Sequence, residues 1–220
     1  MIVGEFILVA AIGYLLGAIP FALIISKRMA GIDISKHGSG NIGSTNVLRV
    51  LGLKAGAIVM ALDLAKAIAP VMLARVIIGD SILSIAGFSL NWQWGQVIAA
   101  LMVMVGHNWS VYIKFRGGKG VAAYYGSWFA ISPMAALIGG VILILTVLLS
   151  KYMSLGSILS ALGILCLFMV LTVAYGSPPV YLIYSLIAAA LIVYQHRSNI
   201  SKLQAGTEGR MSQGRTKLDK

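Results

Sequence analysis

Two glycine-rich segments that also carry cationic, amide and hydroxyl side chains stand out in an otherwise apolar chain. The first is GSGNIGSTNVLR at residues 38–49, and the second is KFRGGKG at residues 114–120. Glycines let a backbone approach a ligand and turn its N–H groups inward, and the fork of Arg49 suits a phosphate group. Neither segment contains an acidic residue. Together they favour the binding of a phosphorylated ligand over an ordinary flexible loop.

The second segment differs from a nucleotide P-loop, because the G-x-x-x-x-G-K-[ST] spacing is absent and Gly120 follows Lys119. Its glycines precede the apolar stretch that begins at Val121. A helix that begins there would direct its dipole and its free N–H groups toward an anion. His107, shortly before this segment, is interpreted as an ordinary histidine at a helix end.

Polar residues also interrupt two apolar regions, and each has a structural and a functional interpretation. Ser154 and Ser157 begin an apolar stretch, where Ser154 is either a helix N-cap or, like Ser157, a substrate contact. Asp63 and Lys66 lie three residues apart on one helix face within a candidate membrane span. Embedded charges are functional candidates, and a simple ion pair is the structural alternative.

The segment HRSNISKLQAGTE, residues 196–208, follows the last apolar stretch. His196 and Asn199 lie three residues apart, so they share one face of a helix. The alternative is a basic helix that rests on anionic lipid. Glu208 is interpreted as a structural partner for an arginine or for backbone N–H groups. No pair of carboxylates and no cluster of metal ligands is visible in the sequence, so we expect neither a metal nor a cofactor.

Composition places these segments in a membrane protein. The chain has 220 residues, of which 59% are hydrophobic and 10% charged, with a mean hydropathy of +0.93. A soluble domain of this size has about 25% charged residues. The single cysteine, Cys166, cannot form an intrachain disulfide. These observations predict an all-α integral membrane protein, with residues 1–210 as one polytopic domain and 211–220 as a polar, disordered tail.

The apolar stretches predict about seven transmembrane helices, because about 20 apolar residues cross a bilayer core of about 30 Å. A proline disfavours helix at the residue before it, so Ser132–Pro133 divides one long stretch into two spans, one of them short. The predicted spans lie near residues 2–25, 55–78, 94–111, 121–149 (two spans), 153–174 and 180–195.

The lysines and arginines are distributed unevenly over the predicted loops. Fifteen of the 17 fall in the loop at residues 26–54, the segment 112–120, the turn at Lys151 and the tail, all on one side of the predicted topology. Positive loops face the cytoplasm, so the N-terminus is expected outside and the C-terminus inside. This bias accounts for the net charge of +11 without nucleic-acid binding.

Four segments of the chain resemble the signature segments of the bacterial acyl-phosphate:glycerol-3-phosphate acyltransferases, the PlsY-type family. They are GSGNIGSTNVLR (38–49), GHNWSVYIKFRGGKGVA (106–122), KYMSLGSI (151–158) and HRSNISKLQAGTE (196–208). The resemblance implies a seven-helix enzyme of the bacterial inner membrane with its active site at the cytoplasmic face. It would move an acyl group from acyl phosphate to the 1-hydroxyl of glycerol 3-phosphate, giving lysophosphatidic acid and phosphate in the first step of phospholipid biosynthesis. Acyl phosphate, glycerol 3-phosphate and the bilayer are the implied partners, and the protein is expected to be a monomer.

The resemblance also implies roles for individual residues. Ser39 and Arg49 would contact glycerol 3-phosphate, Thr45 and Asn46 would hold acyl phosphate, and Glu208 would be structural. The implied catalytic residues are Ser39, His196 and Asn199, and the implied substrate-binding residues are Gly38, Gly40, Asn41, Thr45, Asn46, Arg49, Arg116, Gly117, Gly118, Lys119, Gly120, Ser154 and Ser157. The chain departs from the family pattern at Ser44, Ala67, Tyr124–Tyr125 and Gln195, which leaves the acyl-chain preference open.

The sequence is compatible with three mechanisms of acyl transfer. The hydroxyl proton could pass to His196, whose ordinary pKa of about 6.5 suits a base, or to the donor's own phosphate. An acyl-serine on Ser39 is a third route, and no acyl-enzyme is expected because no serine–histidine–acid set is visible. The alternative function is a membrane transporter for a phosphorylated metabolite. Transporters place substrate sites near the bilayer midplane between repeats, whereas no repeat is visible here and the polar segments lie at helix ends.

Overall fold

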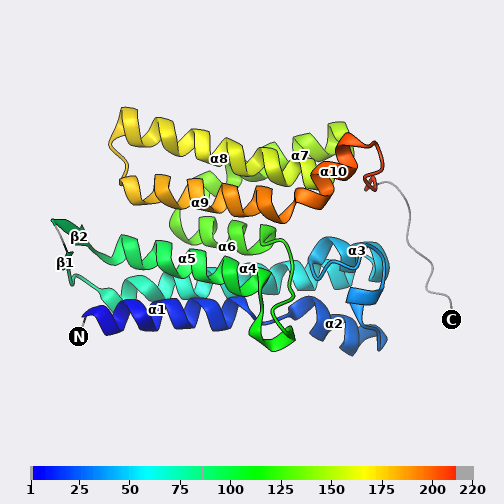
Figure 1. Ribbon diagram of the computed structural model, residues 1–220, viewed down its shortest axis with the longest axis horizontal. Coiled ribbons are helices and arrows are strands. Elements are labelled where there is room, and N and C mark those ends of the chain that lie inside the picture. Colours follow the sequence, from blue (N-terminus) through cyan, green and yellow to red (C-terminus); the bar gives the residue numbers. More distant parts are fainter. Residues whose placement is uncertain (1, 86, 212–220) are drawn as a thin grey trace.

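The structure is a computed structural model that describes residues 2–85 and 87–211 (Figure 1). These residues form an almost entirely helical bundle with one small β-hairpin. The helices are α1 (Ile2–Gly17), α2 (Phe21–Ala30), α3 (Ser44–Leu51), α4 (Leu53–Ile78), α5 (Trp92–Asn108), α6 (Val121–Ile131), α7 (Pro133–Ser150), α8 (Met153–Tyr175), α9 (Pro179–Gln195) and α10 (Arg197–Gln204), with 3-10 turns η1 (Ile34–Lys36) and η2 (Val111–Ile113) and strands β1 (Leu83–Ile85) and β2 (Phe88–Leu90).

Four stretches of the described chain are long and apolar enough to cross a membrane. They are Ile2–Ala30, α4, α7 and α8, and α9 with α10 adds a fifth if this pair, bent by 58°, is counted as one span. The first stretch is broken between α1 and α2 at Ala18–Pro20, because the proline ring removes a backbone donor and disfavours helix before it. In Figure 1, α1, α4, α5, α8 and α9 run side by side along the long axis of the molecule.

The predicted break at Ser132–Pro133 is confirmed. Ser132 is the N-cap of α7, its hydroxyl accepts from the Ala135 N–H at 3.4 Å, and Pro133 occupies the first turn, where its missing N–H costs nothing. The preceding helix α6 has 11 residues. It therefore measures about 16 Å, roughly half of a bilayer core. This short helix carries the glycine-rich segment at its N-terminus.

Residues 26–54 are more ordered than the polar loop that the sequence predicts. They contain the end of α2, the turn η1 and the helix α3. Ile34, Val47 and Val59 are completely buried in a small apolar core between α3, η1 and α4. This satellite core explains why so polar a segment folds, and it holds the first glycine-rich loop against α4. Residues 79–93, between the second and third predicted spans, contain the β1–β2 hairpin.

The main core lies among α4, α5, α6, α8 and α9. Trp128 of α6 is fully buried, stacks on Phe168 with ring centroids 4.6 Å apart, and lies 4.8 Å from the ring of Tyr184. Aromatic contacts of this kind contribute about 0.5–1.5 kcal/mol each beyond their buried area. They fix α6 against α8 and α9, and so fix the position of the loop that precedes α6.

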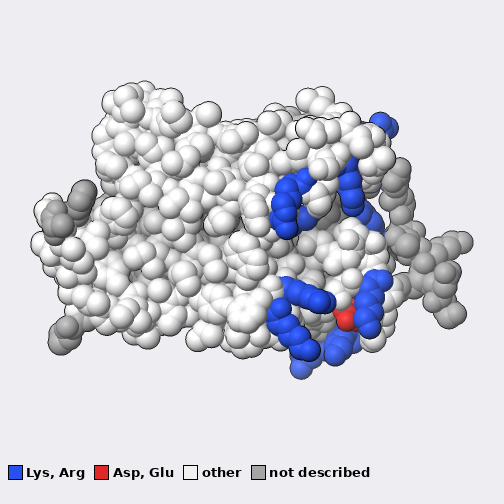
Figure 2. Space-filling model, in the orientation of Figure 1, with Lys and Arg blue, Asp and Glu red and all other residues white. Residues whose placement is uncertain are grey.

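Among the described residues the lysines and arginines gather at one end of the molecule, apart from Arg75, which lies beside Trp92 near the hairpin. On the face shown in Figure 2 they surround a hollow in the half that holds α2, α3 and α10, and the other half is free of them. The polar loops and the C-terminal segment meet at this end (Figure 1). The bundle thus brings the glycine-rich segments and the basic residues together, as their predicted placement on one side requires.

Candidate active site

A cavity of about 890 Å³ opens among the described residues at the basic end of the bundle. One part of its wall is polar and comes from α3 and the loop before it, the loop between α5 and α6, and the C-terminal segment. The other part is apolar and comes from α6 and α7. Four cations and two carboxylates line it: Arg49, Lys119, Lys202, Arg210, Asp63 and Glu208. A cavity with a cationic end and an apolar end suits a ligand that joins phosphate to a hydrocarbon chain.

Asn46 organises the first glycine-rich loop. Its side chain is buried, and its Nδ2 donates to the carbonyl oxygens of His37 at 2.9 Å and Asn41 at 3.1 Å. Its Oδ1 accepts from the backbone N–H of Ser39 at 2.9 Å. Gly38 has φ +59°, and a Cβ there would lie 2.3 Å from Asn46 Oδ1, so glycine is required. These amide contacts are made within the loop, so Asn46 shapes the loop, and Asn46 also lines the cavity.

The loop that Asn46 shapes presents several predicted residues to the cavity. Ser39 is exposed on its wall, and Thr45 and Arg49 follow on α3, one helical turn apart. Gly38 and Asn41 also line the cavity, whereas Gly40 does not. The structure therefore brings most of the first segment to one wall and leaves Gly40 behind it.

Only part of the second glycine-rich segment lines the cavity, and the rest packs against other parts of the protein. Lys119 lines the cavity, but Arg116, Gly117, Gly118 and Gly120 are absent from its described wall. The Arg116 side chain is exposed, and its backbone forms an isolated bridge with Ser110. The substrate contacts expected of Arg116 and of these glycines stay predictions, and these residues lie outside the described lining of the cavity.

The two glycines before Lys119 are instead pressed against the C-terminal end of α5. A Cβ on Gly117 would lie 2.2 Å from the His107 carbonyl oxygen, and one on Gly118 would lie 2.2 Å from His107 Nε2. The Gly118 N–H donates to the His107 carbonyl at 3.0 Å, so it is not free to bind an anion. The free N–H groups at the start of α6 remain suited to that purpose.

A chain of hydrogen bonds connects this segment with the C-terminal part of the protein. Lys119 Nζ donates to Asn199 Oδ1, and Asn199 Nδ2 donates to Glu208 Oε1 at 2.6 Å. The same Glu208 oxygen accepts from Ser154 Oγ at 3.0 Å. Burial lowers the pKa of the Lys119 ammonium. Asn199 is thus fixed from both sides, with its amide oxygen toward the lysine and its amide nitrogen toward the carboxylate.

The predicted partner of Glu208, an arginine or backbone N–H groups, is wrong for the described residues, because two side chains take that place. Among the described residues its carboxylate accepts from Asn199 and Ser154, and no ion pair with an arginine is present. Ser154 is not an N-cap either, because Tyr152 occupies that position in α8 without a side-chain cap. Ser157 Oγ donates to the Met153 carbonyl at 2.9 Å and lines the cavity.

The C-terminal segment after α10 returns to the bundle. The Met211 N–H donates to the Lys151 carbonyl at 2.9 Å, and the Arg210 guanidinium lies 5.8 Å from the centre of the Tyr152 ring. The predicted disordered tail, apart from Met211, lies outside the described residues. This return places Thr207, Glu208 and Arg210 on the cavity wall.

His196 lies between α9 and α10 and is buried, with 3% of its surface exposed. Its Nδ1 is 2.8 Å from the Ile192 carbonyl oxygen. A carbonyl only accepts hydrogen bonds, so Nδ1 carries the proton and Nε2 of the neutral ring carries a lone pair. Burial lowers the pKa of His196 to about 4. The ring is therefore neutral at physiological pH and is a weaker base than its ordinary pKa suggests.

The apolar wall and several polar residues were not predicted as site residues. Tyr125 and Phe129 of α6 line the cavity opposite Leu137, Gly140 and Val141 of α7. Tyr125 also shares a hydrogen bond with Ser160 of α8. Their apolar spacing is the ordinary signal of a core or lipid-facing helix, and only the departure from the family pattern at Tyr124–Tyr125 pointed to this place.

Within the described residues, no group of three histidine, cysteine, aspartate or glutamate side chains is close enough to hold a metal ion. The polar wall instead combines hydrogen-bond donors and cations with two neutral acceptor groups, the His196 ring and the Asn199 amide. This arrangement can bind anions and orient a hydroxyl group.

Comparison with known proteins identifies the family. A family model described as glycerol-3-phosphate acyltransferase matches residues 7–206. The chain belongs to this family. Among curated members of the glycerol-3-phosphate acyltransferase family, glycerol-3-phosphate acyltransferase 3 of Dehalococcoides mccartyi is 41% identical over 213 residues, which are 97% of this chain and 99% of the relative. The glycerol-3-phosphate acyltransferase of Thermoanaerobacter sp. is 42% identical over 207 residues, 94% of this chain and 96% of the relative.

Crystal structures of PlsY, an integral membrane glycerol 3-phosphate acyltransferase, share this fold. The glycerol 3-phosphate form has a TM-score of 0.82 at 35% identity, covering 94% of this chain and 96% of PlsY. The lysophosphatidic acid form has a TM-score of 0.81 at 36% identity, covering 94% and 95%. The helical bundle is therefore that of an integral membrane member of the glycerol-3-phosphate acyltransferase family.

Proposed function

We propose that the protein transfers an acyl group from acyl phosphate to the 1-hydroxyl of glycerol 3-phosphate, giving lysophosphatidic acid and inorganic phosphate. The observation that carries this proposal is the single cavity that joins a cationic wall to an apolar wall between α6 and α7. Membership of the glycerol-3-phosphate acyltransferase family supports the acceptor. Both substrates are anions, which suits the cationic wall, and one has an acyl chain, which suits the apolar wall.

The reaction needs orientation and charge stabilisation, because an acyl phosphate is already activated. The oxygen of the 1-hydroxyl forms a bond to the acyl carbonyl carbon, and the bond from that carbon to the phosphate oxygen breaks. Arg49 and Lys119 are suited to hold the two anions side by side, and the N–H groups at the start of α6 face the leaving phosphate. Ser39, exposed on the wall, is suited to donate a hydrogen bond to a phosphate or carbonyl oxygen.

The proton of the hydroxyl ends on the departing phosphate in this proposal. A phosphate group has a second pKa of about 6, whereas burial lowers the pKa of His196 to about 4, so the phosphate is the stronger base. His196 then accepts a hydrogen bond at Nε2 and orients the hydroxyl, together with Asn199. Ser39 has no histidine–acid pair of its own among the described hydrogen bonds, which supports direct transfer without an acyl-enzyme.

The proposed topology has seven embedded helices: α1, α4, α5, α6, α7, α8 and α9. α5 and α9 have 17 residues each, enough for a short span, and the 11-residue α6 is the shorter of the two spans that are divided at Pro133. The basic end in Figure 2 would face the cytoplasm of a bacterial inner membrane, which places the cavity there and the N-terminus outside. Residues 1–210 would act as one domain and as a monomer.

Donor choice tests this function most simply. The purified protein is supplied with labelled glycerol 3-phosphate and either acyl phosphate or the matching acyl thioester, and lysophosphatidic acid is measured. Product from acyl phosphate alone supports the proposal. Product from the thioester alone contradicts the proposed donor while leaving the acceptor intact.

A further inference from the structure

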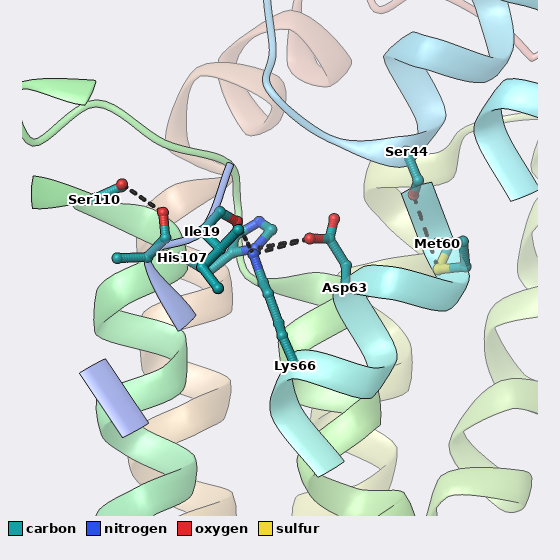
Figure 3. Close-up of polar contacts among 8 residues, drawn as sticks. Ile19, Ser44, Met60, Asp63, Lys66, His107 and Ser110 are labelled. Carbon is teal, nitrogen blue, oxygen red and sulfur yellow. Dashed lines mark hydrogen bonds and ion pairs between the residues drawn. The ribbon is translucent and has the colours of Figure 1, made fainter. Parts of the chain in front are cut away.

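A buried polar unit lies at the active-site wall and is not used by the proposed chemistry. It consists of Asp63 and Lys66 on α4 and His107 on α5, and we call it the α4–α5 unit (Figure 3). Lys66 Nζ lies 2.8 Å from Asp63 Oδ1, and the two side chains are 4% and 2% exposed. His107 Nδ1 lies 3.9 Å from the same carboxylate oxygen. The expected Asp63–Lys66 pair is therefore present, but it has additional partners.

The lysine of this unit also holds the break between α1 and α2. Lys66 Nζ donates to the Ile19 carbonyl at 2.8 Å and lies 5.7 Å from the centre of the Phe21 ring. The adjacent carbonyl, that of Ala18, accepts from Ser110 Oγ at 2.5 Å (Figure 3). A helix break leaves carbonyls without partners, which is costly inside a membrane protein. Ser110 satisfies the Ala18 carbonyl, and Lys66 adds a second donor to the Ile19 carbonyl, which also accepts from the Phe21 N–H at 3.1 Å. These contacts tie the break to α4 and to the start of the second loop.

The histidine of the unit supports the second glycine-rich segment. Gly118 donates its N–H to the His107 carbonyl at 3.0 Å, and a Cβ on Gly118 would lie 2.2 Å from His107 Nε2 and 2.8 Å from the Ile42 carbonyl. At this glycine the His107 ring, the first loop and the second loop meet. The next residue, Lys119, reaches Asn199. A small displacement of His107 would therefore move Lys119 relative to the first loop.

Little free space surrounds these contacts. The pocket among Asp63, Lys66, His107 and Gly118 has a volume of about 10 Å³, room for at most one water molecule. The Asp63 and His107 side chains also line the large cavity. The unit thus forms a tightly packed partition between the helix break and the active site.

We propose that the α4–α5 unit positions the segment 114–120, and with it Lys119, against the first loop, and that Asp63 and Lys66 act on glycerol 3-phosphate binding through His107 and Gly118. This inference rests on the proposed function for its kinetic test. All three are positioning residues. A buried ion pair is often replaceable by apolar groups without loss of stability, so its location at the meeting point of five chain segments suggests a role other than stability alone.

The test uses Asp63→Asn/Lys66→Met, which removes both charges together and leaves no unpaired charge. Arg75→Met is the matched control, because Arg75 lies on the same helix with its guanidinium 3.8 Å from the centre of the Trp92 ring, outside the cavity wall. We expect the double variant to raise KM for glycerol 3-phosphate at least ~10-fold with a smaller change in kcat, and the control to leave KM unchanged. His107→Gln, which keeps the ion pair, should show the same split and serves if the double variant does not fold.

Coupling between His107 and Gly118 provides a second, steric test. Gly118→Ala should weaken activity because its Cβ meets the His107 ring. In a His107→Ala background the same methyl group has more room, so the two defects should be non-additive by a factor of ~3 or more. Additive defects would overturn the route through His107.

Calorimetric titration of glycerol 3-phosphate into each variant needs no acyl transfer and separates the two proposals. Weaker binding by the double variant and by His107→Gln, with normal binding by Arg75→Met, supports the positioning role even if the wild-type protein makes no lysophosphatidic acid. Binding and KM that equal those of Arg75→Met in both variants would overturn the inference while leaving the proposed reaction intact.

Discussion

Asn199 donates from Nδ2 to Glu208 Oε1 at 2.6 Å while its Oδ1 accepts from Lys119, so one amide connects the second glycine-rich segment to the C-terminal segment. This relationship fixes which way the amide faces. Its oxygen and nitrogen both have partners of complementary charge, and reversing the amide would oppose donor to donor and acceptor to acceptor. Glu208 therefore orients Asn199, and Asn199 orients Lys119, within the cavity wall.

Replacing Glu208 should lower the stability of the protein, because Glu208 accepts hydrogen bonds from two residues of the cavity wall. Glu208→Ala leaves Asn199 Nδ2 and the Ser154 hydroxyl without an acceptor, which costs about 1–3 kcal/mol of stability. Glu208→Gln retains an acceptor oxygen and should lose less. Thermal unfolding in detergent measures the difference. Equal unfolding temperatures for Glu208→Ala and wild type would contradict the assigned role.

Lys119 and Arg116 offer a matched pair of cations on one segment. Lys119 lines the cavity and Arg116 does not, so Lys119→Met should lower kcat/KM for glycerol 3-phosphate by about 10- to 100-fold, as expected for the loss of a charged hydrogen bond of about 1.5–3 kcal/mol. Arg116→Met should change it less than about 3-fold, within the range of a surface substitution. Equal losses in the two variants would show that the segment acts through its total charge.

The protonation of His196 gives a pH dependence with a definite sign. Its pKa is about 4 in the folded protein and about 6.5 in an unfolded chain, so between these values the unfolded state binds the proton first. Stability should therefore be unaffected by His196 above pH 6.5 and should fall as pH drops toward 4. His196→Gln, which lacks this titration, should lose less stability than wild type between pH 7.5 and 5. A His196 NMR titration with a midpoint near 6.5 would contradict this.

The apolar wall predicts a change in chain-length preference. Gly140 lines the cavity, and a Cβ there meets no atom within 4 Å, so Gly140→Leu should fill the apolar end without disturbing the fold. We expect KM for long-chain acyl phosphates to rise about 10-fold and that for short chains to change less, since about two buried CH₂ groups would be lost. Gly4→Leu on α1 is the control, because its Cβ is equally unobstructed and Gly4 lies outside the cavity wall. The same change in both variants would rule out a steric effect in the cavity.

Local patterns were sufficient for the helical class, for the break before Pro133 and for the meeting of the two glycine-rich segments. Patterns of hydropathy and charge are formed by residues that are consecutive in the sequence, so they can be recognised without the structure. The α1–α2 break was harder to predict. The carbonyls at the break accept hydrogen bonds from Lys66 and Ser110, which are distant in sequence.

The sequence also did not show which residues of the site face the cavity and which use their polar groups within the protein. Asn46 and Gly118 look like ligand-binding residues by type, yet their polar groups are engaged within the protein. Arg116 looks equivalent to Lys119, yet a bridge to Ser110 directs this part of the chain away from the cavity. Such distinctions depend on which long-range contact uses each group, and spacing along the chain does not specify it.

Acyl transfer from acyl phosphate is tested most directly by following both products of one reaction. Purified protein in lipid is mixed with acyl phosphate and labelled glycerol 3-phosphate, and lysophosphatidic acid and inorganic phosphate are quantified together. We predict that the two products form in equal amounts, and that the protein carries no acyl group when glycerol 3-phosphate is omitted. Uptake of labelled glycerol 3-phosphate into proteoliposomes without formation of lysophosphatidic acid would contradict the claim.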